Sequence, residues 1–209
     1  MMDFSKEKQY RELADYVRAA YQSGARDLLW CSDCREINLW TYWQGRGHYD
    51  AQIMLVGQDW GSPWDFDASG GMEKIRELNR GKSAVYMEGN DNPTDNHLVE
   101  LFHSIGFDIM RDAPDLFFTN FVLGYREKGI SGGFKDIWAR QDAPFFCRLA
   151  NIIKPHIILC LGKDTFIPVL RSLNCEIPKI TSYNRFIESD KNPVKVKATP
   201  HNVPAASAG

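Results

Sequence analysis

Polar residues that could take part in catalysis or binding follow directly after an apolar run at positions 53–56. The run is Ile-Met-Leu-Val, and Gly57, Gln58 and Asp59 come next. In open α/β sheets, ligands bind outside the carboxyl ends of the strands. A carboxylate there can stabilise a developing positive charge. We therefore expect Gln58 and Asp59 to contribute to a ligand site, and residues 53–56 to build core.

A second apolar run, over 116–122, contains the polar residues Thr119 and Asn120. The side-chain amide of Asn120 offers both a hydrogen-bond donor and an acceptor. A simpler alternative stays open for both candidate residues. Asp59 is also typical of a helix cap or turn after a strand, and Asn120 of an Asx-turn at a strand end.

Alternating strands and helices must position these residues. Hydrophobic periodicity and breaker residues predict the elements. Strands are expected over 52–57, 116–122, 156–162 and 194–198, and helices over 5–23, 72–79, 137–153 and 165–173. A further helix is capped by Thr94 and carries Leu98, Leu101, Phe102 and Ile105 on one face, while Pro168 fits only the first turn of its helix. The alternation predicts an α/β fold with three layers, in which helices cover both faces of a four-stranded parallel sheet.

Length and composition favour one domain. The chain has 209 residues and a net charge of −2. It therefore lacks the overall positive charge typical of proteins that bind nucleic acid, although a single basic face could still bind it. We expect a single domain over 1–209, with 1–50 as an N-terminal helical and cysteine-containing extension. No apolar run approaches the roughly 20 residues of a membrane span. Five cysteines without a signal peptide indicate reduced thiols in the cytoplasm. We also expect the protein to be a monomer.

Four blocks in this order resemble the uracil-DNA glycosylase superfamily. They read IMLVGQDWGSPWD, TDNHLVELFHSIGFDI, LFFTNFVLGYRE and CRLANIIKPHIILCLGKDTF, and the match covers roughly residues 28–173. The resemblance implies a four-stranded parallel sheet with its active site at the carboxyl ends of the strands. One branch of the superfamily carries G-Q-D-P-Y-H, which Gly57, Gln58 and Asp59 match. The iron–sulfur branch carries G-E-A-P-G, which Gly57 and Gly61 match.

The resemblance also implies roles for individual residues. Asp59 would orient the water that attacks the sugar C1′, and Gln58 and Asn120 would contact the base. The target base must first leave the duplex, because its glycosidic bond is inaccessible in the stack. His201 is the nearest counterpart of the family histidine, and Phe66 is the candidate stacking ring, with Trp60 and Trp64 as rivals.

The chain departs from the family at two positions in this loop. Gly61 stands where one branch has the tyrosine that excludes thymine, and Trp60 replaces a proline. A shifted histidine, in the sequence Pro-His-Asn at 200–202, also breaks the pattern. Lysines and arginines around the second strand are candidate phosphate contacts, with scattered surface charge as the alternative. They are Arg126, Lys128, Lys135 and Arg140.

The iron–sulfur branch places four cysteine ligands around its cluster. Cys31, Cys34 and Cys147 occupy three of these places, and the segment 121–143 lacks the fourth. A [4Fe–4S] cluster is therefore a candidate cofactor with one ligand unassigned. Zinc bound by Cys31, Cys34 and His48 is the alternative, and Cys160 is expected to be a buried apolar thiol.

Three functions follow from these patterns. The first is a DNA-repair glycosylase that hydrolyses the N-glycosidic bond of uracil or a related deaminated base, with DNA as its partner. The second is a member of the same fold that binds nucleic acid or a nucleotide without cleaving it. The third is a small-molecule hydrolase, for which the chain has no G-x-S-x-G motif or P-loop.

Overall fold

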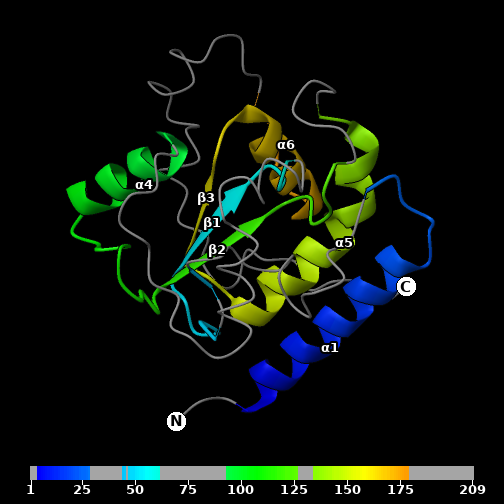
Figure 1. Cartoon of the computed structure of the whole chain (residues 1–209), viewed down its shortest axis with the longest axis horizontal. Helices are drawn as coiled ribbons and strands as arrows, with labels where there is room; N and C mark the ends of the chain where they lie inside the picture. The colour runs from blue at the N-terminus through cyan, green and yellow to red at the C-terminus, as the bar shows by residue number, and fades with distance from the viewer. Residues whose placement is uncertain (1–3, 29–43, 46, 62–92, 127–133, 179–209) are drawn as a thin grey trace.

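A computed structural model of the chain describes residues 4–28, 44–45, 47–61, 93–126 and 134–178. Three parallel strands form its sheet, in the order β2-β1-β3. The strands are β1 (Ile53–Gly57), β2 (Leu116–Asn120) and β3 (Ile157–Cys160), and the helices are α1 (Phe4–Gln22), α4 (Pro93–Ser104), α5 (Asp136–Ile153) and α6 (Lys163–Ser172) (Figure 1). The α/β class is thus confirmed. The helix expected over 72–79 and the fourth strand over 194–198 lie outside the described residues.

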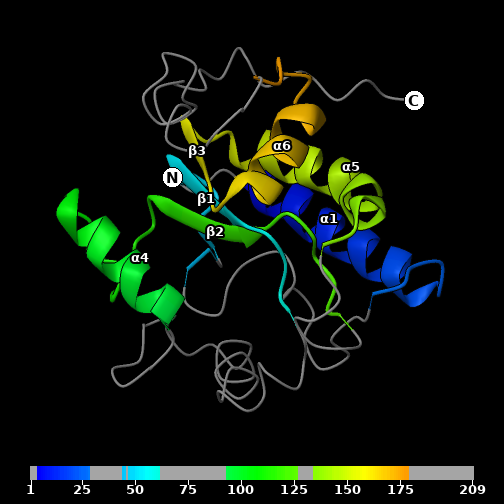
Figure 2. The ribbon, with the colours of Figure 1, turned by 90° about the horizontal axis from the view of Figure 1, so that it is seen from above.

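Side chains from the two faces of the sheet enter two separate cores. Met54, Val56 and Phe117 face a core shared with α1, α5 and α6. Ile53 and Leu55 face the other core, which α4 covers. Figure 2 shows α4 on one side of the sheet and the other three helices on the opposite side. Every residue of β1 and β2 is buried, as expected for parallel strands covered on both faces.

The order of the strands makes β1 the point where the direction of the connections reverses. The chain passes from β1 to its neighbour β2 through α4, and then crosses to the other side of β1 through α5. Connections that leave a strand in opposite directions, over opposite faces, create a topological switch point at the carboxyl edge. The segments that follow β1 and β3 therefore border the expected ligand position.

The predicted helix after position 93 differs from the structure in two ways. It begins at Pro93, so Thr94 lies inside the helix instead of capping it, and a proline suits the first helical position. Leu98 and Phe102 are buried, but Leu101 and Ile105 are 50% and 55% exposed. The expected four-residue apolar face is therefore wrong. A helix on a sheet buries one ridge of residues four apart, here Leu98 and Phe102. Leu101 lies on the adjacent ridge, and Ile105 follows the end of the helix.

Two further element boundaries differ from those predicted from the sequence. The helix α6 begins at Lys163, which places Pro168 beyond its first turn, contrary to expectation. Pro168 is buried there, although a proline inside a helix cannot donate a backbone hydrogen bond. The strand β2 ends at Asn120, two residues earlier than predicted.

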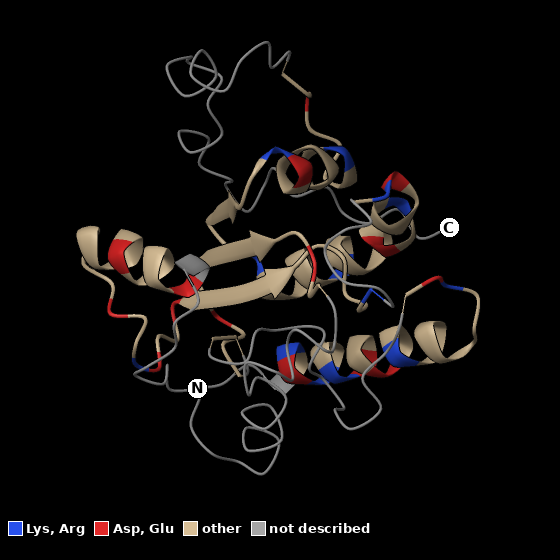
Figure 3. Cartoon of the chain, turned by 45° about the horizontal axis from the view of Figure 1, so that its top comes forward, with Lys and Arg blue, Asp and Glu red and all other residues tan. Residues whose placement is uncertain are grey.

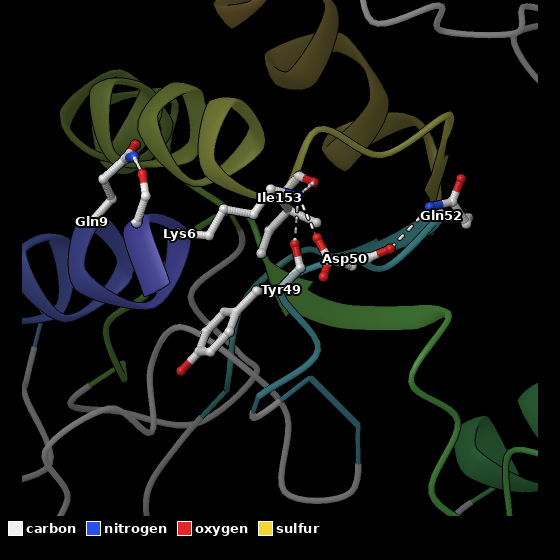
Figure 4. Close-up of polar contacts among 7 residues, drawn as sticks. Lys6, Gln9, Tyr49, Asp50, Gln52 and Ile153 are labelled. Atoms are coloured by element: carbon white, nitrogen blue, oxygen red, sulfur yellow. Dashed lines mark hydrogen bonds and ion pairs between the residues drawn. The ribbon is translucent and has the colours of Figure 1, made fainter. Parts of the chain in front are cut away.

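The helix α1 is an integral part of the main core, because Tyr10, Leu13 and Val17 have no exposed surface. Its outward face carries interspersed charges of both signs (Figure 3). At its start, Lys6 joins three elements near the amino edge of the sheet (Figure 4). The Lys6 ammonium donates to Tyr49 O at 3.1 Å and Ile153 O at 3.3 Å, and it pairs with Asp50 Oδ1 at 2.8 Å.

Replacing Lys6 with methionine is expected to lower the free energy of unfolding by about 1–3 kcal/mol, because three acceptors lose a charged donor. Urea unfolding followed by circular dichroism measures this. Lys8→Met is the matched control, since Lys8 lies on the same helix, is exposed and, among the described residues, pairs only with Glu12 at 4.0 Å. The control should change stability by less than about 0.5 kcal/mol. Equal losses in both variants would contradict the role of Lys6.

Candidate functional site

Gly57 and Asn120 lie side by side at the carboxyl ends of β1 and β2. They are register partners in the parallel ladder. A Cβ atom added to Gly57 would lie 2.2 Å from Asn120 Oδ1 and 3.6 Å from Phe118 Cε2. The Asn120 side chain therefore covers the face of Gly57, and only glycine leaves room for it. Gly57 is required here by this close approach.

The side-chain amide of Asn120 is a buried polar group. Asn120 is 7% exposed, and its side-chain amide makes no hydrogen bond to any other described residue, while its main-chain oxygen accepts one from Thr119 Oγ1 at 3.3 Å. The atoms of this amide are not among the fully buried side-chain atoms that lack a partner in the described residues, so they keep contact with solvent at the edge of the sheet. The arrangement presents an amide to a ligand that approaches the edge of the sheet.

A double-mutant comparison tests this packing. Gly57→Ala is expected to lower the free energy of unfolding by about 1–3 kcal/mol, because the new methyl group displaces the Asn120 side chain. In an Asn120→Ala background the same substitution should cost under about 1 kcal/mol, since the opposing atom is gone. Chemical denaturation of the four proteins measures both values. The same loss in the two backgrounds would show that Asn120 does not cover Gly57.

The segments after β1 and β2 continue to run together beyond the strands. Phe121 N donates to Gly57 O at 2.8 Å, and Val122 N donates to Gln58 O at 3.0 Å. The side chain of Gln58 is half-buried and makes no hydrogen bond to a described residue. This main-chain pairing fixes Gln58 and Asn120 at neighbouring positions on one edge, as the sequence predicted.

Asp59 is held on both of its carboxylate oxygens. Oδ1 accepts a hydrogen bond from Gly61 N at 2.8 Å, which forms an Asx-turn. Gly61 itself has a left-handed conformation at φ 68°. Oδ2 pairs with Nη2 of Arg126 at 2.5 Å. The side chain of Asp59 is 6% exposed. The turn alternative for Asp59 therefore describes its local contacts, and the ion pair adds a partner that the sequence did not suggest.

Arg126 is buried behind this turn. Its main-chain N–H donates to Gly61 O at 2.8 Å, and its guanidinium carbon lies 5.4 Å from the ring centre of Trp138 on α5. The expectation that Arg126 reaches phosphates at the surface does not agree with this position. Lys135 and Arg140 are exposed, and Lys128 lies outside the described residues.

Trp60 packs against the segment that follows β2. Its ring centre lies 6.0 Å from that of Tyr125, with 32° between the ring planes. The ring of Trp60 is therefore engaged within the protein. The rival stacking residues Phe66 and Trp64, like the candidate histidine His201, lie outside the described residues.

A buried carboxylate supports the Asn120–Arg126 segment from behind. Asp142 of α5 has no exposed surface. Its carboxylate accepts hydrogen bonds from Leu123 N at 2.8 Å, from the Tyr21 hydroxyl and from the Arg26 guanidinium. Burial raises the pKa of Asp142, and the donors from Leu123, Tyr21 and Arg26 oppose that rise. The cluster ties α1 and α5 to the segment that carries Asn120 and Arg126.

The expected metal ligands are only partly within the described residues. Cys147 lies on α5, where its thiol donates to Ser172 O at 2.8 Å and burial raises its pKa. Cys31 and Cys34 lie outside the described residues. Among the residues that are described, no group of three or more His, Cys, Asp or Glu side chains could hold a metal. The described residues thus supply one candidate cluster ligand, Cys147.

His48 lies away from the candidate site. Its Nδ1 is 2.7 Å from Leu116 O, at the start of β2, and its Nε2 is 2.7 Å from Asp112 Oδ1. Both ring nitrogens therefore already face oxygen atoms, which does not suit a zinc ligand. The contacts anchor the segment that leads into β2.

Cys160 of β3 is partly buried against the main core. Burial raises the pKa of its thiol from 9.0 to about 12. Because the thiolate is the nucleophile, we expect slow alkylation of Cys160 by iodoacetamide at pH 8.5 in the folded protein, and faster alkylation of the exposed Cys175. Peptide mass spectrometry after a time course resolves the two sites. Equal labelling rates would contradict the burial of Cys160.

The same shift has a consequence for stability. The folded state holds the Cys160 proton more tightly than the unfolded chain. The protonated thiol therefore contributes fully to the free energy of unfolding below pH 9, and this contribution falls as the pH rises towards about 12. The difference in unfolding free energy between the native protein and a Cys160→Ala variant should therefore shrink above pH 9.

A shallow pocket of about 180 Å³ lies between α5 and α6. Its lining includes Phe121, which follows Asn120, and the exposed side chains of Arg140 and Arg171. None of Gln58, Asp59 and Asn120 lines it. The residues predicted from the sequence therefore meet at the edge of the sheet, separate from this pocket.

Sequence reasoning did not predict the contacts of Asp142 and Arg126, the two buried charged residues behind the segment that carries Asn120. Asp142 could have been found, because it interrupts the apolar ridge that includes Trp138, Phe145 and Leu149 on its helix. Arg126 stands directly after an apolar run, but nothing in the sequence directs its side chain to Asp59.

Comparison of the chain with protein-family models and with curated proteins finds no match. In the described residues, no helix is both long enough and apolar enough to cross a membrane.

Proposed function

We propose that the chain is a DNA glycosylase, which hydrolyses the N-glycosidic bond of uracil or a related deaminated base. The observation that carries the proposal is the pairing of Gly57 with Asn120 at the carboxyl ends of neighbouring parallel strands. A buried amide there can hydrogen-bond the edge of a pyrimidine, and Asp59 follows two residues after Gly57. The resemblance to the uracil-DNA glycosylase superfamily supports the same assignment.

In the proposed reaction, Gln58 and Asn120 bind the base and Asp59 activates the water. The base leaves the stack and enters the edge of the sheet, where Gln58 and Asn120 contact it. As the bond from C1′ to the base nitrogen breaks, its electron pair leaves with the base and positive charge develops on the sugar. Water then forms the new bond to C1′, Asp59 accepts a proton from that water, and the departing base is protonated in turn.

The geometry of Asp59 is compatible with this role. Each carboxylate oxygen has two lone-pair positions. Gly61 N occupies one on Oδ1, and Arg126 occupies one on Oδ2. One position on each oxygen is left for water. The two fixed contacts hold the carboxylate in one orientation, which favours a defined water position.

A second candidate function is nucleobase or nucleic-acid binding without cleavage. The contacts of Asp59 with Gly61 and Arg126 favour this function. A carboxylate that is held by two partners and is 6% exposed resembles a structural turn residue. Such a protein would still use Asn120 to read a base.

Incubation with a labelled oligonucleotide that contains one uracil, as a single strand and as a duplex, separates the two functions. Alkaline cleavage of the product detects abasic sites, and fluorescence anisotropy at two salt concentrations measures affinity. Uracil-dependent abasic sites support the glycosylase. Salt-sensitive binding with no abasic sites would reject it and support the binding protein. A matched oligonucleotide with thymine in place of uracil tests whether Gly61 admits the methyl group.

A further inference from the structure

Arg126 contacts Asp59 and the turn that carries it from two directions. The guanidinium Nη2 lies 2.5 Å from Asp59 Oδ2, and the main-chain N–H donates to Gly61 O at 2.8 Å. Gly61 in turn donates its own N–H to Asp59 Oδ1 at 2.8 Å. These three contacts close a ring in which Arg126 fixes both the carboxylate and the backbone of the loop.

The position of Arg126 is itself fixed from the opposite side. Its guanidinium lies over the ring of Trp138, and Trp138 is 5% exposed. Lys135 Nζ lies 5.2 Å from the centre of the same ring. Arg126 is therefore held between α5 and the loop after β1, with its side chain 9% exposed.

Stability alone does not account for this burial. The Nε–H group of Arg126 is buried and has no hydrogen-bond partner within the described part of the chain. A buried donor that is left unsatisfied destabilises the fold. A pair of apolar residues would fill the same space without that penalty.

We infer that Arg126 is the positioning residue for Asp59. It sets the direction of the carboxylate towards the attacking water and does not touch the DNA. This role rests on the proposed glycosylase activity. A planar guanidinium suits it, because it can bond a carboxylate and pack on an aromatic ring at the same time.

The inference is tested by base release under single-turnover conditions, with DNA affinity measured separately. We expect Arg126→Gln to lower the rate constant about 10²-fold and to change Kd for the uracil-containing oligonucleotide by less than about threefold. The double variant Arg126→Gln with Asp59→Asn should be no slower than Asp59→Asn alone, because residues that act as a unit are not additive.

Arg126→Lys provides the conservative variant. Lysine keeps the charge but cannot hold Asp59 and pack on Trp138 with one planar group. We expect a rate between those of the native protein and Arg126→Gln, about tenfold below the native rate. If Arg126→Gln does not fold, as judged by circular dichroism, this variant carries the test.

Arg111→Gln is the matched control. Arg111 pairs with Asp108 at 3.2 Å, both side chains are exposed, and the pair precedes β2 instead of following it. This control should retain the native rate. A native rate in the folded Arg126 variants, or a loss confined to Kd, would overturn the positioning role. A native protein that releases no uracil would instead overturn the proposed function, and this role with it.

Discussion

Replacement of Asp59 by asparagine is expected to slow the release of uracil by about 10²–10⁴-fold, the usual contribution of a positioned acid or base. An amide can keep the hydrogen bond from Gly61 N, so the turn is preserved. It cannot take up a proton from water, and it carries no charge to stabilise a cation at C1′. Single-turnover release of base, at enzyme concentrations above Kd, measures the loss without interference from product release.

Asp115→Asn is the control for this substitution. Asp115 precedes β2, its side chain is exposed, and that side chain makes no hydrogen bond to a described residue. The control should leave the rate unchanged. Because Asp59→Asn removes the partner of a buried guanidinium, its unfolding must be measured in parallel. A folded Asp59→Asn protein with the native rate would exclude Asp59 from the reaction.

Replacement of Asp142 by alanine is expected to lower the free energy of unfolding by about 3–5 kcal/mol, as when one partner of a buried ion pair is removed. The substitution leaves the hydroxyl of Tyr21, the guanidinium of Arg26 and the N–H of Leu123 without their common acceptor. Domains of this size are stable by only about 5–15 kcal/mol. Urea unfolding followed by circular dichroism measures the change.

Asp136→Ala on the same helix is the matched control for Asp142. Asp136 is exposed and lies 4.0 Å from Arg140 in an i,i+4 pair. Its loss should cost less than about 1 kcal/mol, from the surface pair and the helix dipole. Comparable losses in the two variants would show that Asp142 is not a structural hub. The affinity of Asp142→Ala for DNA should also fall, because Asp142 supports the segment after Asn120.

Strong local patterns made much of the fold predictable. The run before Gly57 is fully apolar, and a continuous apolar run bounded by breakers predicts a buried strand. The amphipathic spacing of Tyr10, Leu13 and Val17 predicted α1. Since parallel strands share one carboxyl edge, the same patterns placed Asp59 and Asn120 on that edge.

Features that depend on tertiary contacts could not be predicted in the same way. Leu101 and Ile105 have the spacing of a buried ridge, but the helix presents its neighbouring ridge to the sheet. Arginine has a long, flexible side chain, so its sequence position does not reveal that Arg126 reaches Asp59. The hydrogen bonds of Gln44 Nε2 to Ile109 O and Arg111 O link segments far apart in the chain.

Nuclear magnetic resonance of the Asn120 side-chain amide tests the central claim most directly. The ligand is a single-stranded oligonucleotide with one 2′-fluoro-2′-deoxyuridine, whose fluorine disfavours positive charge at C1′ and so slows cleavage. We expect the Asn120 amide and the backbone amides of Gly57 and Gln58 to shift on titration. Unchanged signals at these residues, with shifts confined to the Arg140 and Arg171 region, would contradict the account.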